Sequence, residues 1–392
     1  MTMRKWLAVL MASYVLFSGT FTYAAVPKTE VSGDKLHLKA KAAVLMDANS
    51  GKILYVKNGK EALAPASMTK LMTLVLAMKA INSGKVAWSD QVPVSDEAYQ
   101  MGGAQIWLEP GEQISLRQLL KAIAIGSAND ACVAIAEYIG GSEEEFVNMM
   151  NQEAKVLGME NSNFANPHGL DEAGHAVSAV DMAKLARYAV TVPGLLKLTA
   201  MMEDRTIRNG KGGFLWLINH NRLLSSYKGM DGLKTGFTSK AGFCLTATAK
   251  RDGFRLISVV MGEPDAKTRT IETRTLLNYG FSQFSSVPIV KANHSMATVK
   301  VIQGIDASIP VSPAEDVYLT IQKGENRKIS QKVELPDSVQ APIQKGQAIG
   351  RLIVYQSGEK IGEVPLIATA SMDKLIGVKL FLHVLRGALH SA

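Results

Sequence analysis

Cysteine is scarce in this chain of 392 residues, which contains only Cys132 and Cys244. Two cysteines are too few for a disulfide framework, and both lie in apolar surroundings, so we expect buried free thiols. A catalytic cysteine needs a base held beside it, and the seven histidines suggest no such partner. The sequence therefore indicates neither a disulfide-stabilised fold nor a thiol enzyme.

The sequence also lacks two common hydrolase signatures, Gly-x-Ser-x-Gly and His-Glu-x-x-His. Their absence excludes the usual nucleophile elbow of α/β hydrolases and the helix of the common zinc proteases. His168 and His175 flank a loop, but neither cysteines nor clustered carboxylates stand at ligand spacing around them. We interpret both histidines as loop-packing residues, and we expect no metal and no cofactor.

No stretch of the chain is both basic and interleaved with aromatic residues, which argues against nucleic acid as a partner. The formal net charge is +8. A mild basic excess of this kind suits an anionic surface such as a cell wall or lipid head groups. With 47% hydrophobic and 20% charged residues, the composition is that of a globular protein, and the length allows two or three domains.

The N-terminal apolar run, residues 6–17, is shorter than the ~20 residues that a membrane-spanning helix needs. Arg4 and Lys5 precede this run, and small residues at positions 22 and 24 follow it. That order is typical of a secretory signal peptide cleaved after residue 24. We predict a signal peptide over residues 1–24 and an exported protein, with an uncleaved anchor helix as the alternative.

The segment from residue 36 to residue 284 combines strand and helix patterns, with the strands at its two ends. Alternating apolar residues predict strands, and an apolar period of 3.6 residues predicts helices. Strands at both ends with helices between them indicate an α+β domain whose ends share one antiparallel sheet. We expect strands at 39–46, 52–56, 242–250 and 254–261, with a hairpin turn at 47–51, and helices at 67–80, 116–125, 131–139, 178–189 and 268–277.

The mixture of strand and helix patterns gives way to strand patterns alone after about residue 285. Short β-rich runs separated by Gly, Pro, Asp and Ser turns predict a small all-β domain over residues 285–370. This segment contains no convincing catalytic constellation, so we interpret it as a spacer or a binding module. The strands are expected at 297–302, 317–321, 350–355 and 364–368.

The final segment, residues 371–392, is apolar and is interrupted by four basic residues or histidines. On a helix these four residues fall within a narrow arc, which predicts an amphipathic helix lying in a membrane interface. Two charges in its middle argue against a spanning helix. The alternative is a terminal helix that docks on the β domain. The four residues are Lys379, His383, Arg386 and His390.

The first candidate for chemistry is Ser67-Met-Thr-Lys70. Residues three apart on a helix share one face, so the Lys70 amine can reach the Ser67 hydroxyl and accept its proton when the amine is neutral. The same spacing occurs five times in the chain, so the motif by itself is weak. Only at Ser67 does a proline, Pro65, stand just before the motif and a long apolar helical pattern follow it.

Two further motifs each occur once, Ser127-Ala-Asn129 and Lys234-Thr-Gly236. The first lies at a helix-to-helix junction, where a hydroxyl and a carboxamide can point the same way. The second precedes a strand and offers a cation, a hydroxyl and a glycine that leaves room for a substrate backbone to pair with the strand edge. Taken singly, they also fit a capped helix end and a solvated edge strand.

In this order, the three motifs resemble those of the penicillin-binding proteins and serine β-lactamases. Within that superfamily the chain is similar to the low-molecular-mass D-alanyl-D-alanine carboxypeptidases. Segments 166–171, 231–236 and 341–346, the leader and the amphipathic tail extend the resemblance over nearly the whole chain. It implies a β-lactamase/transpeptidase-like catalytic domain that removes the terminal D-alanine of peptidoglycan pentapeptides through a Ser67 acyl-enzyme and is covalently inhibited by penicillin.

The resemblance also implies a role for each matching residue. Ser67 would attack the carbonyl of the penultimate D-alanine with Lys70 as base, and Ser127 would relay the proton to the departing D-alanine. Asn129 would hold the substrate amide and the lysine. The backbone N–H groups of Ser67 and Phe237 would bind the oxyanion.

On the same grounds, Lys234 would lower the cost of charge near Ser127. Thr235 and Arg269 would bind the terminal carboxylate, with Arg274 and Lys267 as alternatives to Arg269. Gly236 completes the strand motif. The expected partners are a stem peptide ending in D-Ala-D-Ala, β-lactams, and a membrane surface on the outer face of the cytoplasmic membrane.

Three other functions remain open at this level. A β-lactamase would share the acylation step, but the β domain and its tail have no role in a diffusible lactamase. A D,D-endopeptidase that cuts crosslinks would use the same residues. A non-catalytic sensor of β-lactams or cell-wall peptides is less consistent with the sequence, because every expected catalytic position is filled.

Overall fold

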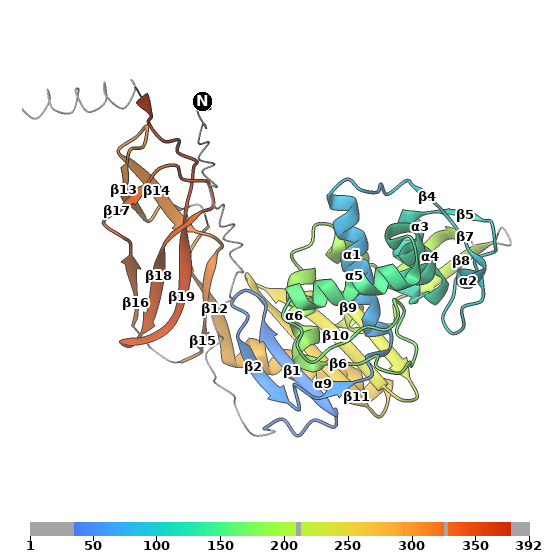
Figure 1. Ribbon diagram of the computed structural model, residues 1–392. Helices are drawn as coiled ribbons and strands as arrows, with labels where there is room; N and C mark the ends of the chain where they lie inside the picture. The colour runs from blue at the N-terminus through green and yellow to red at the C-terminus, as the bar shows by residue number, and fades with distance from the viewer. Residues whose placement is uncertain (1–34, 209–212, 293, 325–327, 378–392) are drawn as a thin grey trace, which may run out of the picture.

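The computed structural model describes residues 35–208, 213–292, 294–324 and 328–377. Figure 1 shows two lobes joined through β12 and β15, an N-terminal lobe of mixed structure and a C-terminal lobe of strands. The predicted signal peptide (1–24) and the four cationic positions of the predicted tail lie outside the described residues.

The N-terminal lobe contains a central sheet, a group of helices and three short strand pairs. Its strands are β1 (Ala42–Asp47), β2 (Ile53–Lys57), β3 (Ala62–Leu63), β4 (Gln91–Pro93), β5 (Gln113–Ser115), β6 (Val177–Ser178), β7 (Glu203–Arg208), β8 (Phe214–Ile218), β9 (Met230–Thr238), β10 (Gly242–Arg251) and β11 (Phe254–Glu263). Its helices are α1 (Lys70–Asn82), α2 (Asp96–Tyr99), α3 (Leu116–Lys121), α4 (Asn129–Gly140), α5 (Glu143–Val156), α6 (Ala179–Ala189), α7 (Leu195–Thr199), α8 (Leu223–Ser226) and α9 (Ala266–Gln283).

The central sheet has the order β2-β1-β11-β10-β9, and each neighbouring pair is antiparallel. Strands from both ends of the lobe are therefore neighbours, with Val44 on β1 opposite Val259 on β11. This confirms the prediction that the ends share one antiparallel sheet. The predicted hairpin between β1 and β2 is also present, and Gly51 N–H closes its turn on the Asp47 carbonyl.

The two faces of the sheet pack against different helices, because successive side chains of a strand point to opposite faces. Val44 and Val259 belong to the larger core, together with residues of α1, α4 and α6. Leu45 and Val260 belong to a smaller core that includes Leu276 of α9. In Figure 1, α9 accordingly covers one face of the sheet, and α1, α4 and α6 lie on the opposite side.

Two predicted helices differ in form from the observed structure. The helix expected from residue 67 begins as a 3₁₀ turn, Ala66–Thr69, and becomes α-helical at Lys70. The helix expected over 116–125 is α-helical only to Lys121 and then widens into a π-helical turn, Ala122–Gly126. It stops there because Ser127 adopts the left-handed conformation, with φ 63°.

Helix α5 (Glu143–Val156) was not expected from the sequence, although its start carries a recognisable signal. The Ser142 hydroxyl accepts the N–H of Glu145, and three glutamates occupy the first turn. A serine cap followed by acidic residues is the usual start of a helix, because both satisfy its free N–H groups.

The C-terminal lobe is a strand domain, as predicted. Its strands are β12 (Phe284–Val290), β13 (Ala297–Ile302), β14 (Ser308–Pro313), β15 (Val317–Gln322), β16 (Ile329–Glu334), β17 (Ser338–Gln340), β18 (Ala348–Gln356) and β19 (Glu359–Ala368). Six of them form a sheet in the order β16-β18-β19-β14-β13-β17, and β12 pairs with β15. Each of the four expected strands corresponds to an observed one, whereas β12, β14, β16 and β17 were missed.

The amphipathic helix expected from residue 371 does not begin there. Met372 and Ile343 exchange backbone hydrogen bonds, and Leu375 N–H donates to the Gln303 carbonyl. These bonds hold residues 371–376 as an extended segment on the C-terminal lobe, so a helix can begin only at residue 377. No helix within the described residues is long and apolar enough to cross a membrane.

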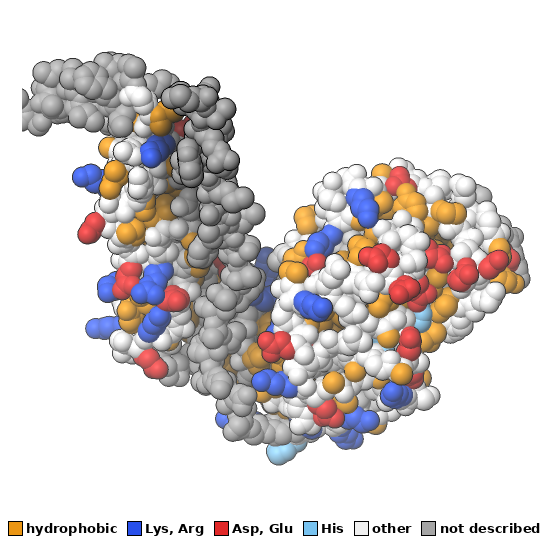
Figure 2. Space-filling view, in the orientation of Figure 1, with side chains coloured by type: hydrophobic (Ala, Val, Ile, Leu, Met, Phe, Trp, Pro, Cys, Tyr) orange, Lys and Arg blue, Asp and Glu red, His pale blue; other side chains and the backbone are white. Residues whose placement is uncertain are grey.

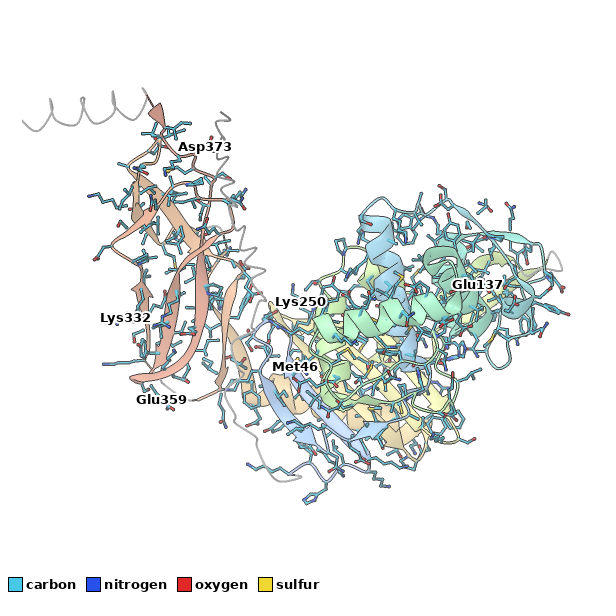
Figure 3. All side chains as sticks on the ribbon, viewed as in Figure 1. Met46, Glu137, Lys250, Lys332, Glu359 and Asp373 are labelled. Atoms are coloured by element: carbon cyan, nitrogen blue, oxygen red, sulfur yellow. The ribbon has the colours of Figure 1, made fainter. Side chains whose placement is uncertain are left out.

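Polar contacts also join the lobes. The fully buried Asp47 at the end of β1 accepts hydrogen bonds from Ser50 Oγ at 2.9 Å and from Thr320 Oγ1 of β15 at 2.6 Å. Asn49 Nδ2 lies 3.3 Å from Ser286 Oγ of β12. In Figure 3, Met46, which precedes Asp47, lies on the side of the N-terminal lobe that faces the C-terminal lobe. Glu137 lies on the opposite side of the N-terminal lobe.

Candidate active site

Ser67 lies in the 3₁₀ turn that precedes α1. Glycines from two other segments close on this turn. A Cβ at Gly169 would lie 2.0 Å from the Ala66 carbonyl oxygen, and a Cβ at Gly236 would lie 2.9 Å from that of Pro65. Only glycine fits these contacts, so the loop around residue 169 and strand β9 both hold the backbone around Ser67.

The Lys70 amine reaches the Ser67 hydroxyl, as the spacing predicted. Nζ lies 2.9 Å from Ser67 Oγ, 2.7 Å from Asn129 Oδ1 and 2.5 Å from the His168 carbonyl oxygen. The side chain is fully buried, and this desolvation lowers the pKa of the amine from 10.5 to about 8. An amine with such a pKa is neutral in part of the molecules near pH 7, as a general base must be.

Ser127 and Asn129 stand where the π-helical turn ends and α4 begins. The left-handed backbone of Ser127 turns the chain between these two elements. Asn129 is 3% exposed, and its carboxamide is held at both ends: Oδ1 accepts from Lys70, and Nδ2 donates to the Gly102 carbonyl at 2.6 Å. The junction predicted from the sequence therefore places Asn129 against the Lys70 amine.

The Lys234-Thr-Gly motif lies within β9, the edge strand of the sheet, and does not merely precede a strand. Lys234 and Thr235 are only 3% and 5% exposed, so this edge is not solvated at the motif. Burial, followed by the positive charges of Lys70 and Arg269, lowers the pKa of Lys234 to about 7. Phe237, two residues after Thr235, is 52% exposed and packs its ring 4.3 Å from that of Phe243.

Arg269 of α9 is 7% exposed, and its Nε is buried without a hydrogen-bond partner. Its guanidinium carbon lies 5.9 Å from the centre of the Phe243 ring, and Phe243 is the β10 residue opposite Phe237 of β9, so α9 reaches the same edge of the sheet as the Lys234 motif. Arg274, the alternative considered from the sequence, is held elsewhere, because its guanidinium donates to Ser226. A buried arginine with an unpaired nitrogen is suited to an anionic ligand such as a carboxylate.

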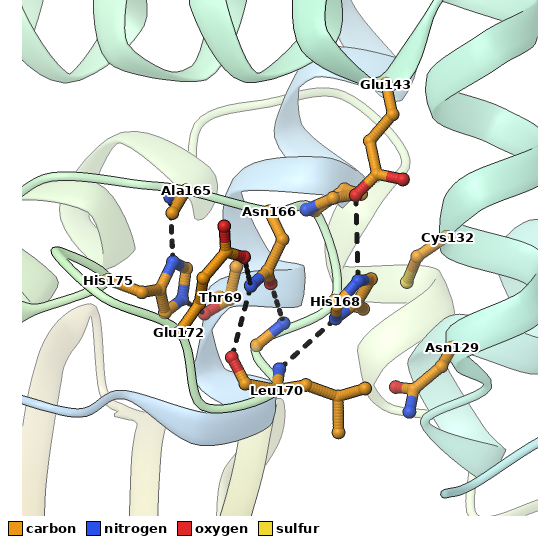
Figure 4. Close-up of polar contacts among 12 residues, drawn as sticks. Thr69, Asn129, Cys132, Glu143, Ala165, Asn166, His168, Leu170, Glu172 and His175 are labelled. Atoms are coloured by element: carbon orange, nitrogen blue, oxygen red, sulfur yellow. Dashed lines mark hydrogen bonds and ion pairs between the residues drawn. The ribbon is translucent and has the colours of Figure 1, made fainter. Parts of the chain in front are cut away.

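The loop of residues 165–175 contributes more than the sequence suggested. His168 supplies the carbonyl that accepts from Lys70. Its ring accepts the Leu170 N–H through Nδ1 and lies 3.7 Å from Glu143 through Nε2 (Figure 4). Burial, reinforced by the charge of Lys70, lowers the pKa of His168 to about 3, so the ring is neutral. A backbone carbonyl carries no residue-type signal, so sequence reasoning had no means of finding it.

Both cysteines are free and buried, as predicted. Burial raises the pKa of Cys132 to about 12, so this thiol is not a nucleophile although it lies near Lys70. Among the residues that the structure describes, no three His, Cys, Asp or Glu side chains are grouped as a metal site would require.

A β-lactamase, one of the alternatives considered above, would hold its deacylating water with a glutamate, and a Glu-x-x-x-Asn sequence occurs at Glu144 and Asn148. Both residues are exposed on α5, and Asn148 Nδ2 donates to Glu145. The motif therefore does not contribute to the cluster around Ser67. Figure 2 shows acidic side chains gathered on this face of the N-terminal lobe, and basic and acidic side chains mixed on the C-terminal lobe.

A turn that carries a serine, a buried lysine of lowered pKa, a carboxamide and a strand edge with a lysine are together the groups that a serine acyl-transfer site requires. Residues 28–265 match the family model described as D-alanyl-D-alanine carboxypeptidase, and residues 284–374 match that of the penicillin-binding protein 5 C-terminal domain. The chain therefore belongs to the D-alanyl-D-alanine carboxypeptidase family, as its motifs predicted.

Its relatives cover nearly the full chain. It is 43% identical over 374 residues to the D-alanyl-D-alanine carboxypeptidase DacF of Bacillus subtilis, with 95% of each chain covered. It is 35% identical to DacC of Escherichia coli, over 86% of this chain and 84% of the relative. Penicillin-binding protein 5 of Haemophilus influenzae has a similar structure, with a TM-score of 0.75, 33% identity, and coverage of 86% of this chain and 98% of the other.

The ampicillin-bound form of penicillin-binding protein D2 from Listeria monocytogenes also has a similar structure. Its TM-score is 0.57 at 32% identity, over 63% of this chain and 99% of the other.

Proposed function

We propose that Ser67, activated by Lys70, is the nucleophile of this serine-type D-alanyl-D-alanine carboxypeptidase. The single observation that supports this most strongly is the set of contacts around Lys70 Nζ. Two acceptors, Asn129 Oδ1 and the His168 carbonyl, lie within 2.7 Å of the amine. A neutral amine donates its two protons to them, and its lone pair is left for the Ser67 hydroxyl at 2.9 Å.

In the proposed acylation step, Ser67 Oγ attacks the carbonyl carbon of the penultimate D-alanine while Lys70 accepts the hydroxyl proton. The tetrahedral intermediate collapses to an ester, the amide bond breaks, and Ser127 relays a proton to the departing D-alanine amine. Water then attacks the ester, returns a proton to Ser67 Oγ and releases the shortened peptide as a carboxylic acid. A β-lactam undergoes the first step alone, with its opened ring still attached to Ser67.

Charge at the site supports recognition of the terminal carboxylate. Lys234 and Arg269 are both buried, Arg269 Nε has no hydrogen-bond partner within the described part of the chain, and the pKa of Lys234 is lowered to about 7. A substrate carboxylate between them would offset their repulsion and restore the charge of Lys234. Thr235 would add a hydroxyl donor, and Gly236 would let the substrate backbone approach β9.

The oxyanion would form where β9 meets the turn. Ser67 N–H belongs to the first turn of a helix, where N–H groups lack helical partners, and Phe237 N–H follows the close contact of Gly236 with that turn. Two such donors, each contributing about 3 kcal/mol in other enzymes, would stabilise the intermediate.

Ser67→Ala tests the assignment, and Ser225→Ala is the matched control because Ser225 belongs to another Ser-x-x-Lys sequence whose hydroxyl is exposed. We expect Ser67→Ala to lose covalent labelling by a fluorescent penicillin and D-alanine release from a peptide ending in D-Ala-D-Ala. Ser225→Ala should retain both. Labelling of Ser67→Ala would refute the nucleophile, and rapid turnover of penicillin by the unaltered protein would favour a β-lactamase.

We also propose export and a peripheral membrane position, with a signal peptide at 1–24, a catalytic domain at 36–284 and a β domain from 285. The proposal rests on the leader pattern and on the amphipathic pattern of the terminal residues. Because residues 371–376 pair with the C-terminal lobe, the informative truncation ends at residue 376. That variant should leave the membrane fraction and still release D-alanine; unchanged membrane retention would rule out the anchor.

A further inference from the structure

A second histidine of the 165–175 loop, His175, is buried and contacts Thr69 in the turn that carries Ser67. It is 4% exposed. Its Nδ1 accepts the N–H of Ala165 at 2.9 Å, and its Nε2 lies 2.7 Å from Thr69 Oγ1 (Figure 4). Because Nδ1 accepts a hydrogen bond, the proton of the neutral ring is on Nε2, and Nε2 donates to the threonine hydroxyl.

This donation fixes the direction of the next hydrogen bond. Thr69 Oγ1 receives the histidine proton, so its own proton is directed to the Ala66 carbonyl oxygen at 2.9 Å. Ala66 immediately precedes Ser67 and has a φ of 48°, a region that residues other than glycine rarely occupy. Such a conformation persists only where its surroundings enforce it.

We propose that His175 is a positioning residue for the nucleophile: through Thr69 it holds the Ala66 carbonyl, and thereby sets the direction in which Ser67 Oγ faces the Lys70 amine. The inference rests on the proposed function, because it assigns His175 a role only if Ser67 is the nucleophile. The chain of donors runs from Ala165 N–H through His175 and Thr69 to Ala66, with each donor matched to one acceptor.

The protonation state of His175 is consistent with this arrangement. Burial lowers its pKa to about 4; the nearby carboxylates of Glu172 and Asp171 act against this shift, and the charge of Lys70 adds to it. The ring is therefore neutral at neutral pH. A protonated ring would place an N–H against the N–H of Ala165, and the directed chain would break.

Three substitutions separate positioning from general stability. His175→Phe keeps an aromatic ring but removes both hydrogen bonds. His175→Gln keeps an acceptor for Ala165 and a donor for Thr69 on one amide. Thr248→Val is the matched control, because it also removes both hydrogen bonds of a buried hydroxyl on a strand outside the Ser67 turn: the one donated to the Leu256 carbonyl at 2.9 Å and the one accepted from Arg255 Nη1 at 3.0 Å.

The measurement is the limiting rate constant of acylation by a fluorescent penicillin, taken from the exponential time course. Unfolded molecules change only the amplitude of this course, so a purely structural role would lower the amplitude and leave the rate constant unchanged. We expect His175→Phe to slow acylation on the order of 10- to 100-fold, as for reacting groups that are misplaced by a fraction of an ångström to 1 Å. His175→Gln should recover most of the loss, and Thr248→Val should match the unaltered protein.

An unchanged rate constant in His175→Phe would overturn the inference. The inference would also be overturned if His175→Gln slowed acylation as much as His175→Phe does, because the chain of hydrogen-bond donors would then have no effect on the rate constant. Nitrogen-15 NMR of the histidines gives a separate test: the resonances lost in His175→Phe should be those of a neutral Nε2–H ring at pH 6, and a charged or Nδ1–H ring would also overturn the inference. If the unaltered protein neither binds penicillin covalently nor releases D-alanine, the proposed function fails instead.

Discussion

The contact between Gly169 and the Ser67 turn yields a quantitative prediction for Gly169→Ala. An added Cβ would lie 2.0 Å from the Ala66 carbonyl oxygen and 2.9 Å from Thr69 Oγ1. Real Cβ atoms essentially never approach a backbone atom within 3.0 Å, so the turn or the loop must move by about 1 Å. A displacement of that size at reacting groups costs about 100-fold in rate.

Gly141→Ala is the matched control for backbone strain. Gly169 and Gly141 have φ values of +89° and +88°, and the added Cβ at Gly141 meets nothing within 4 Å. Placing alanine in this conformation costs roughly 1–2 kcal/mol of stability at either site. Both variants should therefore unfold at lower temperature, but only Gly169→Ala also displaces Ser67.

The assay is the limiting rate constant of acylation by a fluorescent penicillin, with thermal unfolding measured in parallel. We expect Gly169→Ala to react about 100-fold more slowly than Gly141→Ala. If the two rate constants agreed within about threefold while both proteins remained folded, the loop would not determine the position of Ser67, and the reasoning would be refuted.

Two further predictions follow from the pKa of Lys70 and from the contacts between the lobes. With the pKa of Lys70 near 8, the limiting acylation rate should fall about tenfold per pH unit below pH 8, because Lys70 gains a proton and ceases to act as base. At low penicillin concentration the acylation rate should instead peak between about pH 7 and 8, because Lys234 loses the charge that binds the penicillin carboxylate above pH 7. An acylation rate that does not change between pH 6 and 9 would contradict Lys70 as base. Asp47→Ala removes the buried acceptor of Thr320 and should lower the unfolding free energy in urea by about 2–4 kcal/mol, with acylation unchanged. An unaltered unfolding midpoint would show that the junction contributes nothing.

Local patterns predicted the elements with strong periodicity. The strands around Val44 and Val259 alternate two apolar faces, and the sequence placed them in one sheet because helices fill the interval between them. Helix α5 was missed although its Ser142 cap and its apolar period were visible, because its first turn is rich in glutamate and few of its residues are apolar. The short strand β17 has no period that a pattern could detect.

The candidate site was predictable at the level of side chains and not at the level of the backbone. Ser67 and Lys70 are adjacent because they are three residues apart in a helical segment, which is a local relation. Asn129 is 59 positions from Lys70, and its contact with the amine was expected only through the family resemblance. The His168 carbonyl is an atom common to every residue, so no residue type announces its contact with Lys70. Gly169 and Gly236 are visible as glycines, but the backbone carbonyls that they approach are not.

The sequence by itself therefore determined the order of the motifs, the strand-rich C-terminal half, the burial of two free cysteines and the family, because these depend on residue types and their spacing. Only the tertiary structure decided the environment of the Lys70 amine. Its pKa falls because α1 is packed inside the lobe, and its protons are directed by groups from a distant helix and a distant loop. Desolvation and hydrogen-bond direction arise from packing across the fold, and no local stretch of sequence contains them.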